Sequence, residues 1–501
     1  MSEDSQVVVE AEPLQLPEKK RVNYLLLPDW GKDSRLAAEA IDAFCKAFLP
    51  SDDVCLVLWL PSDLGFSTSD AERLILEALE ARGHQLDNTP DLLLLDGVSQ
   101  ANMFELLCEV QAVVGGGGSL LEKEAFARGL PVVLVNSRMM RAIYDEVMSL
   151  DRVLEALPDL RYHAHQAALG HWGYQELDYH LTQFAMGYEE YSARRQTPHA
   201  AYASMRNLFC STNGGFNDGM QRVLASAHPP YAIPSTDGLF GKGDEESLAA
   251  IMEALDTEGL HIFEHRLSLD KVERLKRFAD ETDCWPESLP EGTRRKYEAE
   301  HPIAVKYSFS EADLVKLPDI QAIITDPTLL KVAQQFLGCK PILSHLGMWW
   351  STAFQKTADS DAAQLYHFDM DKINFIQFFV YLTDVSAETG PHCFVRGSHK
   401  QLPMAFRRDG RFTDEETELQ FGPENALEIH GRKGTMFLAN TRGIHKGKHL
   451  QSSDRLLLNV VFASSLFGAP HNRVSIDSRE NPLLVKAMTD YPRIFSRYVA
   501  F

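Results

Sequence analysis

Short hydrophobic runs alternate with amphipathic segments in the first part of the chain. Helical periodicity fills residues 34–48 and 69–82, which lie between such runs. The runs are VNYLLLPDW, VCLVLWLP, DLLLLDG, AVVGGG and PVVLVN. Apolar runs that do not alternate with polar residues are typical of strands buried on both faces, as in a parallel sheet covered by helices. The pattern therefore predicts a Rossmann-like α/β domain over residues 20–150.

A second pattern begins after a segment that periodicity does not resolve. Residues 151–244 contain helical stretches and then a passage rich in Gly, Pro and Asn, so we expect a helical and irregular connector there. Two helical segments then lead into β-type runs, and in INFIQFFVYLTDV the apolar residues barely alternate, which indicates a strand covered on both faces. We expect a double-stranded β-helix, or jelly roll, with flanking helices over residues 245–475 and a tail at 476–501.

Composition and charge exclude several classes of function. The chain has 501 residues, 45% of them hydrophobic, and a formal charge of −22 that repels nucleic acid. Its acidic start lacks the features of a signal peptide, and no apolar run approaches the ~18 residues of a membrane span. Seven scattered cysteines form no CxxC pair. We expect a cytoplasmic protein without membrane insertion, whose oligomeric state the sequence does not indicate.

Candidate metal ligands lie in the segment QLYHFDMD. His367 and Asp369 are two residues apart, so on an extended strand their side chains project to the same side. Two imidazoles and one carboxylate on one face of an octahedral iron leave three positions open. His445 follows a later strand and supplies the third ligand. Arg455, ten residues further on, begins RLLLNVVF and offers a guanidinium fork to a carboxylate.

These residues, together with LTDV and ETGPHCFVRGSHK, resemble the phytanoyl-CoA dioxygenase family in its HxD pair, GSHK-like turn, distal His and following Arg. The resemblance extends from GLHIFEH to the strand that begins at Arg455. It implies a non-haem Fe(II) dioxygenase with iron on His367, Asp369 and His445. It also implies 2-oxoglutarate held by Arg455, O2 as cosubstrate and ascorbate as a candidate reductant. Related halogenases lack the carboxylate, so Asp369 favours hydroxylation, with release of succinate and CO2.

Other polar and aromatic side chains lie near these motifs in the sequence. His449 is a rival to His445, but its spacing to Arg455 is too short for the family pattern. We expect His392 and His399 to pack in the fold, and Asp371 and Lys372 to be solvated loop charges. Further residues on the strands are candidates for the pocket wall. They are Trp349, Trp350, Tyr366, Phe375, Gln377, Phe379 and Tyr381.

The segment AVVGGGGSLLEKEAFARGLPVVLVN resembles the sugar-nucleotide-binding half of glycosyltransferases with two Rossmann-like lobes. The matching positions are Glu124, Ala125, Ala127, Gly129 and Pro131. A Gly-rich turn before a helix can bind a pyrophosphate, which makes a sugar nucleotide a candidate ligand. The first lobe of such enzymes is absent, so an α/β module that binds no nucleotide is an equal alternative.

Two function classes follow from these resemblances. The first is an oxygenase that hydroxylates a small molecule, for which a sugar, a lipid-linked compound and a natural-product intermediate are all open. The second is a sugar-nucleotide-binding or glycosyltransferase-related protein in which the oxygenase domain is secondary. The substrate cannot be identified from the sequence, because the pocket walls come from loops.

Overall fold

The computed structural model describes residues 14–17, 19–30, 35–115, 118–168, 174–234, 237–241, 243–290, 292–360 and 362–501. Gly116 and Gly117 of the Gly-rich turn, and Ser34 at the start of a predicted helix, lie outside the described residues. The chain divides into two compact units. The first comprises residues 1–147 and 499–501, and the second comprises residues 148–498.

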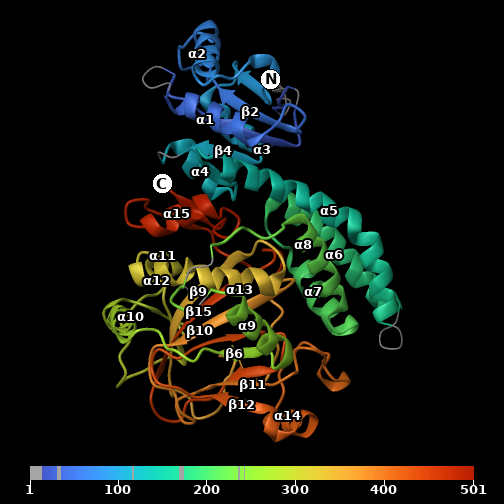
Figure 1. The fold of residues 1–501 in the computed structure, drawn as a ribbon, viewed down its shortest axis with the longest axis vertical. Coiled ribbons are helices and arrows are strands. Elements are labelled where there is room, and N and C mark those ends of the chain that lie inside the picture. Colours follow the sequence, from blue (N-terminus) through green and yellow to red (C-terminus); the bar gives the residue numbers. More distant parts are fainter. Residues whose placement is uncertain are drawn as a thin grey trace, which may run out of the picture. The chain divides into compact units, whose positions relative to one another are not determined.

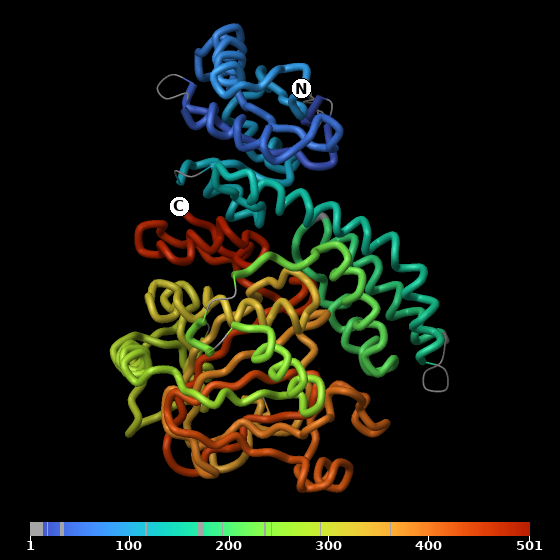
Figure 2. Tube along the Cα trace, viewed as in Figure 1, coloured from blue at the N-terminus to red at the C-terminus, as the bar shows by residue number. Residues whose placement is uncertain are grey.

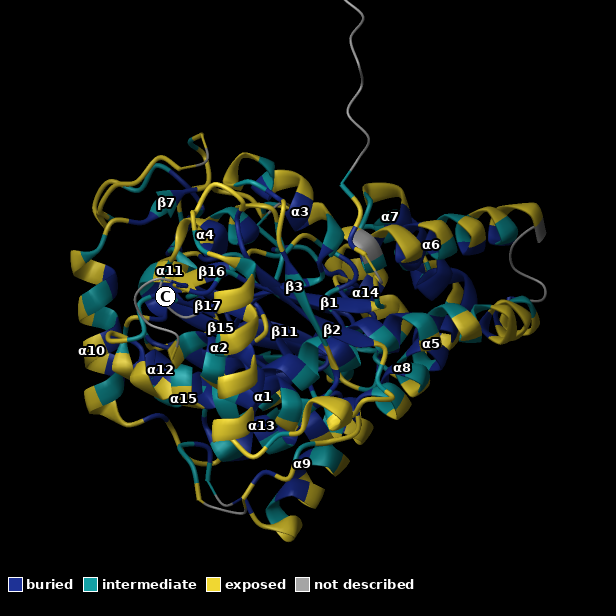
Figure 3. Cartoon of the chain, turned by 90° about the horizontal axis from the view of Figure 1, so that it is seen from above, coloured by how far each residue is buried: buried dark blue, intermediate teal, exposed yellow. Residues whose placement is uncertain are grey.

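The first unit contains the parallel α/β sheet that the hydrophobic runs predict. Its five strands are β1 (Val22–Leu26), β2 (Val54–Trp59), β3 (Asp91–Leu95), β4 (Ala112–Gly115) and β5 (Val132–Leu134). They pair in the order β3-β2-β1-β4-β5, all parallel. This order is the one that doubly wound dinucleotide-binding folds use for their first five strands. The central strands β1 and β2 are buried along their whole length, as Figure 3 shows.

Helices connect these strands. They are α1 (Arg35–Ala47), α2 (Thr68–Ala81), α3 (Met103–Glu109) and α4 (Leu120–Ala127). The periodicity did not predict α3, which is only seven residues long and buries Met103, Leu106 and Leu107. Such a short element spans about two turns, too few to establish a helical period in the sequence.

The segment predicted as a connector forms mostly helix. It holds α5 (Ser137–Ala167), which crosses the unit boundary, followed by α6 (Tyr174–Arg194), α7 (His199–Thr212) and α8 (Gly215–Ala227). Within the second unit these helices share one apolar cluster with residues of the β domain. The cluster includes Phe184, Met205, Phe209 and Met220 from the helices, and Tyr366, Phe368, Met370 and Phe412 from the β domain.

The second unit is built around two antiparallel sheets (Figure 1). The larger has the order β6-β13-β10-β15-β9-β8-β7, and the smaller has the order β12-β11-β14. The strands are β6 (Leu260–Ile262), β7 (Trp285–Pro286), β8 (Lys306–Ser308), β9 (Ile342–Ser351), β10 (Phe375–Tyr381), β11 (His392–Val395), β12 (Ala426–Ile429), β13 (Met436–Ala439), β14 (His445–Gly447) and β15 (Arg455–Ala463).

The two sheets enclose a common core. Phe379, Tyr381 and Phe437 from the larger sheet pack with Phe394 and Ile429 from the smaller one. Two facing antiparallel sheets are the arrangement of a jelly roll. Neighbouring strands come from distant parts of the sequence, so in Figure 2 the green segment of β6 lies beside the orange segment of β13. The folded register, rather than local sequence, therefore determines which residues meet inside the domain.

Helices cover the outer face of the larger sheet. In β10 the side chains of Ile376, Phe378 and Val380 are buried on that face, where Phe240 packs on Phe378 and α13 (Pro327–Leu337) lies against the strand. This covering explains why the sequence of β10 barely alternates. The remaining elements are α9 (Glu245–Thr257), α10 (Leu269–Glu281), α11 (Glu311–Leu314), α12 (Pro318–Ile324), α14 (Asp414–Phe421), β16 (Val474–Ile476), α15 (Pro482–Asp490) and β17 (Tyr498–Ala500).

Among the described residues, no helix combines the length and the apolar character needed to cross a membrane.

Candidate metal centre

The segment that carries His367 and Asp369 alternates between two environments. Tyr366, Phe368 and Met370 are buried in the cluster shared with helices α6 to α8. Because successive side chains of an extended segment point to opposite sides, His367 and Asp369 face the other way. The predicted strand QLYHFD is reduced to single bridges at Tyr366 and His367. The apolar contacts on one side thus fix the direction of the polar pair on the other.

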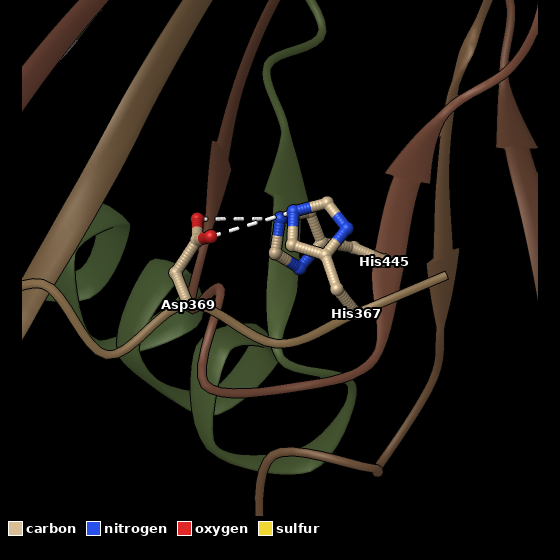
Figure 4. Close-up of side chains that lie close together, drawn as sticks. All are labelled: His367, Asp369 and His445. Atoms are coloured by element: carbon tan, nitrogen blue, oxygen red, sulfur yellow. Dashed lines mark ion pairs between the residues drawn. The ribbon is translucent and has the colours of Figure 1, made fainter. Parts of the chain in front are cut away.

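Backbone pairing brings His445 to the same place. The N–H of His367 donates to the carbonyl of His445 at 2.9 Å, and the N–H of His445 donates back at 2.8 Å. The N–H of Asp369 donates to the carbonyl of Thr441, at the turn that leads into β14, at 2.7 Å. The two imidazole rings lie 4.4 Å apart between centroids. Figure 4 shows both rings turned toward the Asp369 carboxylate.

The three side chains present ligand atoms to one point. Nε2 of His367 lies 3.4 Å from Oδ1 of Asp369, and Nε2 of His445 lies 3.3 Å from Oδ2. One ligand atom from each residue falls within 4.8 Å of the others, and no other such group of three was found among the described residues. Nδ1 of His367 is 2.8 Å from the Leu365 carbonyl, and Nδ1 of His445 is 2.9 Å from the Gly443 carbonyl.

Those Nδ1 contacts fix the tautomer of each imidazole. A carbonyl only accepts, so Nδ1 carries the proton and Nε2 keeps a lone pair directed at the carboxylate. A divalent cation placed between the three groups would be coordinated by the two lone pairs and by the carboxylate anion. The donor set therefore fits Fe(II), with half of an octahedron left open.

The electrostatics favour the same protonation states. Burial lowers the pKa of His367, and the neighbouring His445 lowers it further, so the imidazole is neutral at physiological pH. Burial alone would raise the pKa of Asp369, but the charge of a protonated imidazole at His445 and His367 would hold it well below its usual range. A neutral imidazole and an ionised carboxylate are the forms that bind a metal ion.

An amide relay supports Asp369 from β10 and β15. Nε2 of Gln377 donates to Oδ2 of Asp369 at 2.8 Å and to Oγ1 of Thr441 at 2.9 Å. Nδ2 of Asn459 donates to Oε1 of Gln377 at 3.0 Å, which fixes the direction of the Gln377 amide. The sequence pattern indicates Gln377 only as a candidate for the pocket wall. No motif near Asn459 in the sequence indicates that this residue contributes to the site.

A cavity of about 390 Å³ opens beside Asp369. Its wall is mostly polar and includes His345, Asn459, His471 and Asn472. Three predicted wall residues line it, namely Trp349, Phe375 and Gln377. The four others are not among its lining residues; they are Trp350, Tyr366, Phe379 and Tyr381.

Two residues predicted as solvated loop charges line the same cavity. Asp371 keeps 54% of its side chain exposed and accepts a hydrogen bond from the Tyr202 hydroxyl at 3.1 Å. The prediction is wrong for Lys372, which is 5% exposed and donates to the carbonyls of Leu466 and Ala469. Burial lowers the pKa of Lys372 to about 7. A loop that folds back over the segment provides this enclosure, and the local sequence does not show it.

Arg455 lies at the start of β15, opposite Ser351 of β9. Its guanidinium donates to the Gly390 carbonyl and, at 3.3 Å, to Oγ of Ser351. The side chain is fully enclosed, and burial lowers its pKa from the ordinary value. In the described part of the chain no carboxylate forms an ion pair with it. A buried cation without an anionic partner is costly, so this one fits a carboxylate ligand.

The three other histidines near the motifs, His392, His399 and His449, occupy different settings. Nε2 of His449 lies 2.8 Å from the Gln355 carbonyl, outside the triad. Nε2 of His399 lies 2.9 Å from the carbonyl of Asp256, at the end of α9. His392 is buried, and its ring stacks on that of His445 at a centroid distance of 5.4 Å and an interplanar angle of 19°. Of these three, only His392 is therefore close to the triad without belonging to it.

The Gly-rich turn of the first unit already contains an anion. The Glu122 carboxylate accepts hydrogen bonds from the N–H of Gly118 at 2.9 Å and from the Ser119 hydroxyl at 3.0 Å. A Cβ at Gly115 would lie 2.3 Å from the carboxyl carbon of Glu122. The Gly118 N–H and the Ser119 hydroxyl are thus engaged by the chain itself, where a pyrophosphate would need such donors.

The fold and the geometry of the triad define a candidate non-haem iron centre in a jelly-roll domain. Residues 255–456 match the family model of phytanoyl-CoA dioxygenase (PhyH), and the match lies wholly within the second unit. That family uses Fe(II) and 2-oxoglutarate with O2. The match supports an oxygenase-like enzyme for this region and does not extend to the first unit.

Several solved structures are similar to the chain. The non-heme alpha ketoglutarate dependent epimerase SnoN from nogalamycin biosynthesis shares 19% identity over 44% of this chain and 84% of its own, with a TM-score of 0.32. HygX from Streptomyces hygroscopicus, with nickel and 2-oxoglutarate bound, shares 17% identity over 46% of this chain and 89% of its own, with a TM-score of 0.31. EctD from S. alaskensis shares 16% identity over 48% of this chain and 85% of its own, with a TM-score of 0.33. No curated protein matches the chain.

Proposed function

We propose that the protein is an Fe(II)- and 2-oxoglutarate-dependent oxygenase that hydroxylates a small polar molecule. The observation that carries the proposal is the convergence of two Nε2 lone pairs and one ionised carboxylate on a single point, with both Nδ1 atoms held by backbone carbonyls. This is the set of ligands that ferrous oxygenases use. The family match of the same region supports it.

Each residue then has a definite task. His367, Asp369 and His445 bind the iron, Gln377 orients the carboxylate of Asp369, and Arg455 binds the distal carboxylate of 2-oxoglutarate. Bound iron and 2-oxoglutarate supply O2 activation, with release of succinate and CO2. The buried surroundings of Arg455 keep water away from the cosubstrate, which strengthens its ion pair.

The cavity beside Asp369 indicates the substrate class. Its volume of about 390 Å³ lies within the range of sites for small molecules. Imidazole, amide and carboxylate groups from His345, Asn472 and Asp371 line it, and an acyl chain would leave them without hydrogen bonds. We therefore favour a sugar or a similarly polar natural-product intermediate over a lipid-linked compound. The carboxylate of Asp369 favours hydroxylation over halogenation.

An anaerobic titration tests the proposal. Wild type and His367→Ala are titrated with Fe(II) and then 2-oxoglutarate, while the visible charge-transfer band of the chelate is recorded. We expect the band in wild type only, because the variant loses a metal ligand. An exposed histidine changed in the same way, His430→Ala, is the control and keeps the band. A wild-type protein that binds iron but never shows the band would contradict the proposed function.

A further inference from the structure

Two buried nitrogen atoms near the triad have no hydrogen-bond partner among the described residues. They are Nε2 of His392 and Nε of Arg455. Buried polar groups in native proteins are almost always hydrogen-bonded, because an unpaired one loses its bonds to water without replacement. Two unpaired groups of this kind close to each other indicate a ligand that would accept hydrogen bonds from both.

Sheet geometry places the two groups side by side. His392 of β11 is directly opposite Gly447 of β14, and His445 lies two residues before Gly447 on the same face. A Cβ at Gly447 would be only 3.6 Å from Nη2 of Arg455, so the guanidinium occupies the space above that glycine. On this face the Arg455 guanidinium lies beyond the metal ligand His445. His392 lies opposite the guanidinium, on the neighbouring strand β11.

The surroundings of the His392 ring hold it in place. It lies 5.1 Å from the ring of Phe379 and 5.3 Å from the ring of Phe437, in addition to its stacking on His445. Its backbone N–H donates to the Tyr381 hydroxyl at 2.9 Å. An imidazole fixed among aromatic rings cannot turn toward water, so its Nε2 stays directed into the enclosed space.

We infer that His392 binds the distal carboxylate of 2-oxoglutarate together with Arg455, an inference that rests on the proposed function. The guanidinium supplies the charge, and Nε2–H of His392 donates a second hydrogen bond to the same carboxylate. His392 therefore selects a 2-oxo diacid over a 2-oxo acid that has no second carboxylate. This role differs from metal binding, because His392 is not part of the group of convergent ligands.

The experiment compares two variants and two cosubstrates. His392→Phe keeps an aromatic ring in the cluster but removes the donor, and His399→Leu is the control from the same GPHCFVRGSHK segment. Fe(II)-loaded protein is titrated anaerobically with 2-oxoglutarate and, separately, with 2-oxobutyrate, and the midpoint of the charge-transfer band is measured. Iron content after dialysis and the thermal unfolding midpoint are recorded for each variant.

We expect His392→Phe to raise the 2-oxoglutarate midpoint by about ten- to a hundredfold, as for loss of a hydrogen bond to a charged group. The 2-oxobutyrate midpoint and the iron content should not change, and His399→Leu should match wild type throughout. If His392→Phe fails to fold, His392→Leu is measured in its place, with the same expected shift.

The outcomes separate the inference from the proposed function. Absence of any band in wild type contradicts the proposed function itself. A normal wild-type band with an unchanged 2-oxoglutarate midpoint in the variant overturns the inference alone. Equal shifts for both cosubstrates, or loss of iron from the variant, would also overturn it, because His392 would then support His445 rather than bind the distal carboxylate.

Discussion

Gln377 shows how a single residue can support a candidate metal ligand without being one itself. Its amide nitrogen donates to Asp369 and to Thr441, and its oxygen accepts from Asn459. Since Asn459 only donates through that nitrogen and the Asp369 carboxylate only accepts, the Gln377 amide cannot flip without losing both of these bonds. The relay therefore holds the Asp369 carboxylate in one fixed orientation toward the proposed metal position. Loss of a supporting bond of this type typically lowers metal affinity by about ten- to a hundredfold.

Gln377→Leu should weaken Fe(II) binding by about ten- to a hundredfold, because the variant keeps the volume but loses the bond to Asp369. The measurement is an anaerobic competition of the protein with a metal-binding indicator. Gln451→Leu, at an exposed position of the same unit, is the control and should bind iron like wild type. Equal affinity in Gln377→Leu and wild type would show that Asp369 is held by the backbone alone.

At the scale of elements, the turn between β4 and α4 illustrates how one motif can have two uses. A Gly-rich turn before a helix is suited to a phosphate, since backbone N–H groups and the helix dipole attract anions. Here the buried carboxylate of Glu122 accepts from Gly118 and Ser119. An internal anion at this position would have to be displaced, against repulsion, by any pyrophosphate.

We therefore expect no measurable binding of UDP-glucose or GDP-mannose to the 501-residue protein in calorimetric titrations. The same titration is made with Glu124→Ala, since Glu124 carries the resemblance to glycosyltransferases. Micromolar binding by wild type that disappears in Glu124→Ala would restore the sugar-nucleotide hypothesis for the first unit. It would also show that Glu122 moves away when a nucleotide arrives.

At the scale of the whole molecule, the chain consists of two compact units, and all the proposed iron and cosubstrate ligands belong to the second. Units with separate cores commonly unfold in separate steps. A ligand that binds only the native state stabilises the unit that contains its site, by about 2.7 kcal/mol at a hundredfold excess over Kd. Metal and cosubstrate should therefore act on one unit only.

Scanning calorimetry under anaerobic conditions tests this expectation. We expect two unfolding transitions. Only one of them should move to higher temperature when Fe(II) and 2-oxoglutarate are added, and this transition should return to its original temperature when a chelator removes the metal. The His367→Ala protein should show two transitions that do not respond. A single transition that shifts as a whole would show instead that the two units unfold cooperatively.

Much of the architecture follows from local pattern. Runs such as VCLVLWLP bury both faces of a strand, which is why the parallel sheet of the first unit could be predicted. The spacing of His367 and Asp369 fixes their common direction, because side chains of extended backbone repeat every second residue. The motifs that surround them also indicated the oxygenase family, which the match over residues 255–456 supports.

Contacts between distant segments could not be predicted in this way. The register that pairs His367 with His445, the loop that buries Lys372 and the approach of His392 to Arg455 all depend on how strands align and helices pack. Those alignments depend on the burial of many side chains from distant segments. No short stretch of sequence contains all of these side chains. The sequence by itself determined which residues could hold a metal, and the tertiary structure alone decided which groups surround it.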